Sequence, residues 1–158
     1  MNTYIIKWRG PFNDNELLNN DESHGLYLIT GFQKYKRTEN IQYCGITERK
    51  FFQRLNDVEH KKGLVPRERQ FWLGKIISNS EVMRSDLEKV ESLIIYFLQI
   101  ELNVLKKVNA PKPTAIINRW YDKEGNLRKN IRHEAQKLED VIMWDGELWH
   151  FSNRLKIQ

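Results

Sequence analysis

The stretch that decides the expected fold is His24-Gly25-Leu26-Tyr27-Leu28-Ile29, together with its companion Ile41-Gln42-Tyr43-Cys44-Gly45-Ile46. Each run places a tyrosine and a glycine close together among alternating apolar residues, a pattern typical of β-strands. If the two runs pair as a hairpin, they bring the phenols of Tyr27 and Tyr43 together on one sheet. We therefore predict strands over residues 25–32 and 41–46, joined by a basic connection.

A helical pattern follows the second run. Residues 50–61 place Phe51, Leu55 and Val58 along one face, and Gly63 stands just beyond the expected end. This spacing predicts a helix over residues 50–61.

Two further elements complete the expected core. Residues 69–77 are rich in Phe, Trp and Ile and predict a third strand, although Gly74 argues against an unbroken one. The strongest helical pattern covers residues 85–102, where Ser85 and Glu88 have the spacing of a capping box. The apolar residues that repeat at helical spacing there are Val90, Leu93, Ile94, Phe97 and Leu98.

Shorter signals lie on both sides of this core. Residues 3–8 predict a strand and residues 14–18 a short helix or a turn. Near the other end, residues 115–121 are expected to pair with the stretch after Gly125-Asn126. The strongest hairpin signal is Asp145-Gly146, which is flanked by apolar residues.

Composition limits the classes of protein that this chain can belong to. With 158 residues, of which 40% are hydrophobic, the chain fits a single domain, residues 1–158. Cys44 is the only cysteine, which excludes an internal disulfide and a cysteine-based zinc site. No apolar run approaches the roughly 20 residues that cross a bilayer, and the first residues lack a secretory pattern. We therefore expect a cytoplasmic protein without a membrane partner.

The net charge of +5 and the pI near 9.3 favour an anionic partner, of which the phosphate backbone is the commonest. A basic pI is also frequent in proteins that never bind nucleic acid, so charge alone leaves both interpretations open. The distribution is more informative, because basic clusters fall in predicted loops and element ends around the two tyrosine runs: 34–37, 49–50, 61–62, 67–69 and 106–107.

Arg54 and Glu91 add charged groups to the two phenols. Arg54 lies on the predicted helix after the second tyrosine run, and Glu91 lies at the edge of the apolar stripe of the long helix. A carboxylate near a buried stripe is costly unless it is paired or holds a metal ion. Two phenols, a guanidinium and a carboxylate together suit the hydrolysis of a phosphodiester with one divalent metal ion.

This ordered set closely resembles the GIY-YIG nuclease superfamily. The two halves of the family name correspond here to Gly25-Leu26-Tyr27 and Tyr43-Cys44-Gly45, and the family's arginine and glutamate correspond to Arg54 and Glu91. The asparagine that commonly ends the region of the glutamate's helix corresponds to Asn103. The resemblance covers residues 25–103, about half of the chain.

The resemblance implies an α+β fold and a domain organisation. The expected core, residues 23–108, is a small three-stranded antiparallel sheet flanked by helices. Residues 1–22 form an N-terminal strand extension in this interpretation, and residues 109–158 form a C-terminal elaboration that contains a β-hairpin.

The resemblance also implies roles for the site residues. Glu91 would hold one Mg²⁺ or Mn²⁺ ion per active site, Tyr27 and Tyr43 would position or activate water, and Arg54 would stabilise the phosphorane. Asn103 would lie at the edge of the site and hydrogen-bond the glutamate, a tyrosine or a phosphate; capping of the helix is the other interpretation.

Histidine departs from the family pattern. Some members carry a histidine one helical turn after the arginine, where this chain has Val58. His60 would reach the site only if the helix ends early, and we include it among the catalytic candidates; His24 is an alternative at the edge of the site. The predicted nucleic-acid contacts are Arg49, Lys50, Lys61 and Lys62.

The resulting expectation is an endonuclease that cleaves DNA, with RNA not excluded, and that forms a homodimer if it cuts both strands. One alternative is a catalytically inactive nucleic-acid-binding module with the same fold. A second alternative, in which the motif matches arise by chance, predicts that Tyr27, Tyr43, Arg54 and Glu91 are scattered in space.

Overall fold

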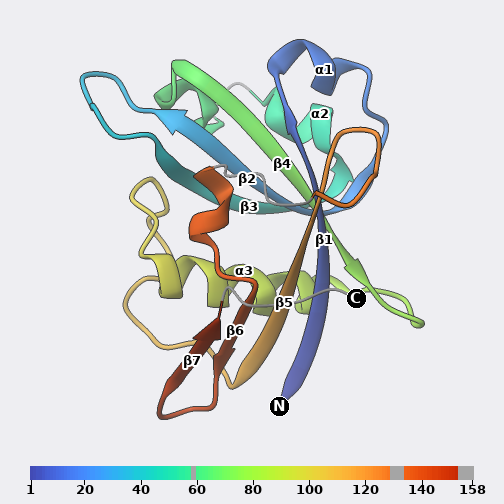
Figure 1. Ribbon diagram of the computed structural model, residues 1–158, viewed down its shortest axis with the longest axis vertical. Coiled ribbons are helices and arrows are strands. Elements are labelled where there is room, and N and C mark those ends of the chain that lie inside the picture. The colour runs from blue at the N-terminus through green and yellow to red at the C-terminus, as the bar shows by residue number, and fades with distance from the viewer. Residues whose placement is uncertain (58–59, 129–133, 153–158) are drawn as a thin grey trace.

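The strands of the protein form one seven-stranded mixed sheet in the order β3-β2-β4-β1-β5-β6-β7 (Figure 1). The computed structural model describes residues 1–57, 60–128 and 134–152. Neighbouring strands are antiparallel except β1 and β5, which are parallel. The strands are β1 (Asn2–Phe12), β2 (Ser23–Phe32), β3 (Asn40–Lys50), β4 (Arg67–Ile77), β5 (Thr114–Tyr121), β6 (Val141–Trp144) and β7 (Trp149–Ser152).

The described part of the chain has three α-helices, α1 (Asp14–Leu18), α2 (Phe51–Leu55) and α3 (Arg84–Leu98). Two short 3₁₀ segments, Lys61–Leu64 and Glu134–Lys137, complete the regular structure. None of the described helices is long and apolar enough to span a membrane.

The expected fold, a small three-stranded sheet flanked by helices, is wrong. Strands β2, β3 and β4 do pair antiparallel, but the sheet continues from β4 through β1 into β5, β6 and β7. The residues expected to form an N-terminal extension include β1, which lies between β4 and β5, and the C-terminal hairpin belongs to the same sheet. Strands from all three expected segments, 1–22, 23–108 and 109–158, therefore share one hydrogen-bonded sheet.

The reason for this error is visible at β1 and β4. Trp8 is fully buried and lies opposite Gly74, and its ring covers the space in which a Gly74 side chain would stand. The sequence analysis had suggested that Gly74 interrupts this strand. It does not: Gly74 makes room for the ring of Trp8, a residue 66 positions away. A pairing over such a distance leaves no local periodicity in the sequence.

Both predicted core helices are shorter than expected. Helix α2 ends at Leu55, because Asn56 leaves the helical conformation and the backbone N–H of Asp57 bonds to the carbonyl of Arg54, only three residues back, at 3.3 Å. Val58, placed on the predicted helix face, lies outside the described residues. Helix α3 begins at Arg84, where the Asp86 carboxylate accepts the backbone N–H of Met83 at 2.9 Å, instead of using the pair Ser85 and Glu88.

Helix α3 ends at Leu98 because Gln99 adopts a left-handed conformation with φ of 50°. The side-chain amide of Gln99 donates to the carbonyls of Tyr96 and Lys107, at 2.8 and 3.1 Å. The chain after α3 is thereby folded back along the edge of β3, where Asn103 and Lys106 line the cleft described below.

The predicted C-terminal hairpin is confirmed, with Trp144 opposite Trp149 across the turn at Asp145-Gly146. The turn over residues 122–126 is also present, because Asp122 N–H donates to Asn126 O at 2.8 Å and Tyr121 forms a bridge with Leu127. The backbone N–H of Arg128 also donates to the carbonyl of Trp120 at 3.0 Å, and residues 129–133 lie outside the described residues.

The hydrophobic core has two parts, one on each face of the sheet. Helix α3 packs on the face that carries Leu26, Leu28 and Cys44. Helix α2 packs on the opposite face, which carries Tyr27 and Ile29. Strand β3 is the outermost strand on this side, so α2 and α3 approach each other around its edge.

Candidate active site

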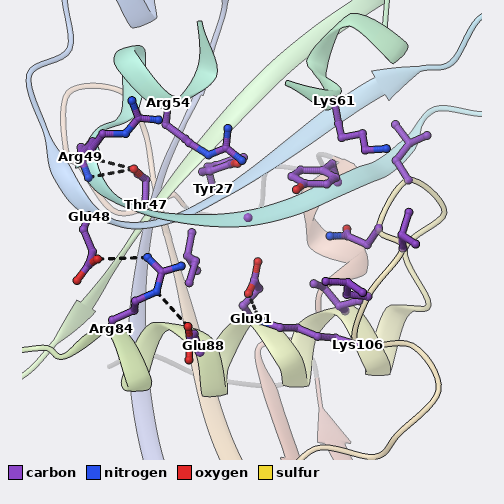
Figure 2. A pocket seen from close by; sticks show the side chains of 18 residues that line it. Tyr27, Thr47, Glu48, Arg49, Arg54, Lys61, Arg84, Glu88, Glu91 and Lys106 are labelled. Carbon is purple, nitrogen blue, oxygen red and sulfur yellow. Dashed lines mark hydrogen bonds and ion pairs between the residues drawn. The ribbon is translucent and has the colours of Figure 1, made fainter. Parts of the chain in front are cut away.

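A cleft of about 660 Å³ runs along β3 between α2 on one side and α3 on the other (Figure 2). Five of the six predicted catalytic residues line it, each from a different segment of the chain. They are Tyr27 from β2, Tyr43 from β3, Arg54 from α2, Glu91 from α3 and Asn103 from the loop that follows. The structure thus contradicts the alternative in which these side chains are scattered.

The two phenols lie side by side, as the hairpin pattern predicted. Tyr27 is paired with Gly45 and Tyr43 with Ile29 in the β2–β3 register, so both tyrosines face the same side. Their ring centroids are 6.1 Å apart at an interplanar angle of 28°. Burial raises the pKa of Tyr27 above its ordinary value, the neighbouring Tyr43 raises it further, and Arg54 opposes both. Tyr27 is therefore a neutral phenol at pH 7.

The sixth predicted residue, His60, does reach the site, because α2 ends early. His60 Nε2 lies 2.7 Å from Tyr27 Oη. On the other side of the ring, the backbone N–H of Lys62 donates to His60 Nδ1 at 3.0 Å. Burial, together with Arg54 and Lys62, lowers the pKa of His60 to about 4. The neutral ring therefore accepts at Nδ1 and donates from Nε2–H to Tyr27, and the Tyr27 hydroxyl is also hydrogen-bonded to Tyr43.

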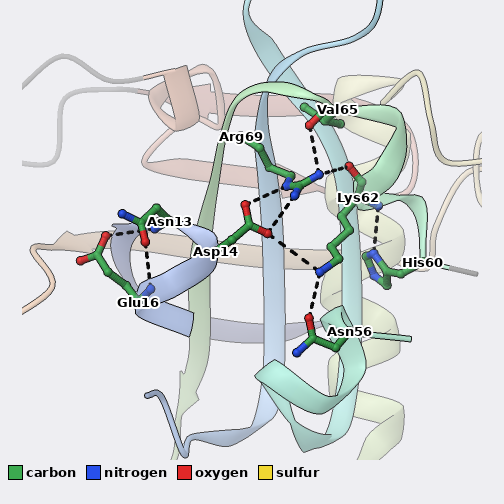
Figure 3. A network of polar contacts seen from close by, with 8 residues as sticks. All are labelled: Asn13, Asp14, Glu16, Asn56, His60, Lys62, Val65 and Arg69. Carbon is green, nitrogen blue, oxygen red and sulfur yellow. Dashed lines mark hydrogen bonds and ion pairs between the residues drawn. The ribbon is translucent and has the colours of Figure 1, made fainter. Parts of the chain in front are cut away.

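A polar network fixes the segment that carries His60 (Figure 3). Arg69 of β4 donates to the carbonyls of Lys62 and Val65, at 2.8 and 3.4 Å. Its guanidinium also binds both carboxylate oxygens of Asp14 in α1, at 2.9 and 3.1 Å. The N-terminal helix thus helps to position a histidine that lies 46 residues further along the chain.

Asp57, which the sequence analysis missed, orients Arg54. The Asp57 carboxylate accepts from the Arg54 guanidinium at 3.0 Å and from Arg49 at 2.6 Å. Hydrogen bonds from Arg49 lower the pKa of Asp57, and Arg54 acts in the same direction. Arg54 lines the same cleft as the two phenols, and its charge acts to lower the pKa of Tyr27, Tyr43 and His60.

Glu91 is the buried carboxylate of the cleft, with 9% of its surface exposed. Lys106, on the loop after α3, forms an ion pair with Glu91 Oε2 (Figure 2). Burial raises the pKa of Glu91, while the hydrogen bond from Lys106 lowers it. Because a cation already neutralises this carboxylate, the site is suited to positive charge at this position.

A second charged group lies at the N-terminal end of α3. Arg84 binds Glu48 of β3 at 3.2 Å and Glu88 at 3.0 Å, and all three residues line the cleft. Arg84, Glu88 and Glu91 recur at spacings of four and three residues, which places them on one face of α3. The spacing of these three charged residues is visible in the sequence and could have predicted that they share one face of the helix.

Asn103 lines the cleft, but its hydrogen bonds go to the backbone of β3. Its side-chain carbonyl accepts the backbone N–H of Cys44 at 3.0 Å, and its amide donates to the carbonyl of Cys44 at 2.9 Å. Asn103 thus satisfies the outer edge of β3 as a neighbouring strand would. It does not cap α3, whose C-cap is Gln99.

The predicted nucleic-acid contacts divide into two pairs. Arg49 and Lys61 line the cleft. Lys62 is instead committed to the network of Figure 3, where its ammonium donates to Asn56 at 2.9 Å. Lys50 lies outside the cleft lining, with its ammonium 6.0 Å from the ring of Phe52. His24 also lies outside the lining, where Nδ1 is 3.2 Å from the Ser23 hydroxyl.

The donor set fits a metal ion held through one carboxylate. Among the described residues, no group of three His, Cys, Asp or Glu side chains is placed to bind a metal ion. Mg²⁺ retains several waters and needs only one or two protein carboxylates with substrate oxygens. Glu91 meets this requirement, provided that Lys106 gives way.

Sequence reasoning missed Lys106 as the partner of Glu91, although the basic pair at 106–107 had been noted. The loop between α3 and β5 has no periodicity from which its contacts could be predicted.

Comparisons with protein-family models, with curated proteins and with solved structures found no match to this chain.

Proposed function

We propose that this chain is a divalent-metal-dependent endonuclease of the GIY-YIG type that hydrolyses phosphodiester bonds of DNA. One observation carries the proposal: a single cleft gathers Tyr27, Tyr43, Arg54 and Glu91 from four separate elements. A set of two phenols, a guanidinium and a buried carboxylate matches the needs of phosphodiester hydrolysis. The proposal rests on these residues and does not depend on the small sheet first expected.

The charge of the cleft suits a polyanion. Its lining contains five cationic side chains and three carboxylates, and two of the cations, Arg49 and Arg54, share Asp57. Lys61 forms no ion pair with any of the described residues and is free to contact a phosphate. These charges attract RNA as well as DNA. DNA is the substrate that we propose.

Each residue has a role that follows from its position. Arg54, oriented by Asp57, donates to the non-bridging oxygens of the scissile phosphate and stabilises the added charge in the phosphorane. The phenols of Tyr27 and Tyr43 orient the attacking water. His60 keeps Tyr27 in place through its Nε2–H. A Mg²⁺ or Mn²⁺ ion at Glu91 would polarise the phosphodiester and neutralise the departing oxygen.

The test is cleavage of a supercoiled plasmid in Mg²⁺ or Mn²⁺ by the wild type, by Glu91→Gln and by the matched control Glu88→Gln. Glu88 lies one turn away on the same helix face and pairs with Arg84, so its loss removes a cleft carboxylate but not the proposed ligand. We expect metal-dependent nicking that Glu91→Gln abolishes and Glu88→Gln largely retains. Equal cleavage by the wild type and Glu91→Gln would refute the site.

The products also report the assembly. One cleft serves one strand, so linearisation at a single encounter requires two chains. We expect a homodimer on the DNA if linear product appears without accumulation of nicked circles, and sedimentation of the complex measures this directly.

A second candidate, a binding module without turnover, is favoured by the ion pair between Lys106 and Glu91. A carboxylate neutralised by a lysine has no need of a metal ion. This candidate predicts that the folded protein binds DNA equally with and without Mg²⁺ and leaves the plasmid intact.

A further inference from the structure

The connection between β2 and β3 displays an aromatic ring to solvent. Tyr35 is 88% exposed, more than any other large hydrophobic side chain among the described residues. Its φ of 64° lies in the left-handed region, which aromatic residues seldom adopt. The ring is therefore held outside the core by the backbone of its own turn.

This turn is fastened to the sheet. The backbone N–H of Lys36 donates to the carbonyl of Gln33 at 3.1 Å. Arg67 of β4 donates to the carbonyls of Gln33 and Lys36, and the Gln33 amide donates to the side chain of Gln42 at 2.8 Å. Because these bonds preorganise the turn, a ligand that contacts Tyr35 meets a ring whose backbone is already ordered.

Positive charge surrounds the ring. A surface hollow of about 660 Å³ is lined by residues 34–37, Pro66 and Arg67, and none of these lining residues is acidic. Lys34 lies with its ammonium 5.0 Å from the Tyr35 ring. Among the described residues, Lys34 and Arg37 form no ion pair, so their charges are available to an anion.

The hollow lies next to one end of the cleft. Lys36 pairs with Glu101 at 3.7 Å, and Glu101 directly precedes Leu102 and Asn103, which line the cleft. Both partners of this pair are well exposed, so it contributes little to stability and yields readily to a phosphate. A strand lying in the cleft can therefore continue over residues 34–37.

We propose that residues 34–37, with Arg67, bind an unpaired segment of the nucleic acid, with one base stacked on Tyr35 and the flanking phosphates on Lys34 and Arg37. An exposed aromatic ring among cations is the combination that binds single strands, because stacking needs a base face that a duplex hides. This inference rests on the proposed function for the identity of the polyanion, but it concerns a surface outside the catalytic cleft.

The test is fluorescence anisotropy with the full chain, in EDTA to prevent cleavage, on three labelled probes: a single strand, a blunt duplex and the same duplex with a single-stranded overhang. The variants are Tyr35→Ala, Tyr35→Phe and the control Phe151→Ala, which removes another exposed ring from β7. We expect Tyr35→Ala to weaken binding of the single strand and the overhang roughly tenfold. Tyr35→Phe and Phe151→Ala should retain affinity for them, and the blunt duplex should be bound equally by all.

A second variant tests the cations. Lys34→Ala with Arg37→Ala should reduce the slope of log affinity against log salt for the single strand by about 1.4. An unchanged slope would refute these two phosphate contacts. Because all the substituted side chains lie on the surface, a thermal unfolding curve confirms that each variant is folded.

The outcomes separate the inference from the proposed function. Tyr35-dependent binding of single strands without plasmid cleavage supports the inference and refutes the nuclease. Cleavage by the wild type, with single-strand affinity unaffected by Tyr35→Ala, refutes the inference and leaves the nuclease standing. A wild type that binds none of the probes refutes the inference, and intact plasmid in the same preparation refutes the nuclease separately. Tyr35-dependent capture of an acidic peptide in place of the oligonucleotides would assign the surface to a protein partner and overturn the inference.

Discussion

Tyr27 lies directly opposite Gly45 across β2 and β3, and a Cβ atom at Gly45 would stand 2.4 Å from both Cζ and Oη of the tyrosine. The ring of the first motif therefore occupies the space that the glycine of the second motif leaves empty. The two motifs are therefore in direct contact. Glycine is required at position 45 because the Tyr27 ring fills the space of a side chain there, and not because of the backbone conformation.

The substitution Gly45→Ala should displace the Tyr27 ring and lower the free energy of unfolding by about 1–3 kcal/mol. Plasmid cleavage should fall far more than stability, because the phenol leaves its position beside His60. Gly63→Ala is the matched control, since a Cβ there meets no atom within 4 Å. Wild-type cleavage by folded Gly45→Ala would show that the position of Tyr27 is unimportant.

His60 should make stability depend on pH. Its pKa is about 4 in the folded protein, against an ordinary value of 6.5, so between these values the unfolded chain binds a proton that the folded chain does not. Stability from this source is complete above pH 6.5 and is lost as pH falls towards 4, by at most about 3 kcal/mol. Urea unfolding of wild type and His60→Gln between pH 4 and pH 7 measures it.

The His60→Gln variant has no imidazole to protonate and should lose less stability on acidification than the wild type. Parallel pH profiles for the two proteins would contradict the assignment of a buried neutral histidine.

Removal of the lysine that pairs with Glu91 should strengthen metal binding. Lys106→Met keeps much of the side-chain volume and removes the ammonium that competes with a cation for the carboxylate. We expect Mn²⁺ to bind Lys106→Met more tightly than the wild type, on the order of tenfold for a competing ion pair of about 1.4 kcal/mol. Titration followed by electron paramagnetic resonance reports binding without any requirement for activity.

The neighbouring variant Lys107→Met serves as the control for this titration and should bind Mn²⁺ like the wild type. Weaker binding by Lys106→Met would mean that the lysine supports the site and does not compete with a cation.

Asn103 should prove to be an anchor for β3. Asn103→Ala leaves the N–H and the carbonyl of the buried Cys44 without these partners, which should cost about 3 kcal/mol of unfolding free energy. Val104→Ala, at an exposed neighbouring position, should cost almost nothing. Chemical denaturation measures both.

Cleavage assays separate this anchoring role from a catalytic one. At a temperature at which Asn103→Ala is folded, its cleavage rate should fall much less than that of Glu91→Gln. An equally severe loss in the folded variant would restore Asn103 as a catalytic residue.

Local patterns were sufficient for the elements around the site. The alternation around Tyr27 and Tyr43 predicted two paired strands, and the apolar repeat after Ser85 predicted a helix with Glu91 at the edge of its buried stripe. Helix ends were less predictable, because the end of α2 depends on the turn at Asn56 and the end of α3 on the side chain of Gln99. The early end of α2 is what allows His60 to reach Tyr27.

The sequence by itself determined which residues are candidates for the site and which local strands and helices carry them, because both are recorded in residue type and short-range spacing. Only the tertiary structure decided that β1 lies inside the sheet, that Asp57 orients Arg54 and that Lys106 neutralises Glu91. These are contacts between residues brought together by packing and by backbone pairing. Their energies depend on distance in space, to which no periodicity along the chain corresponds.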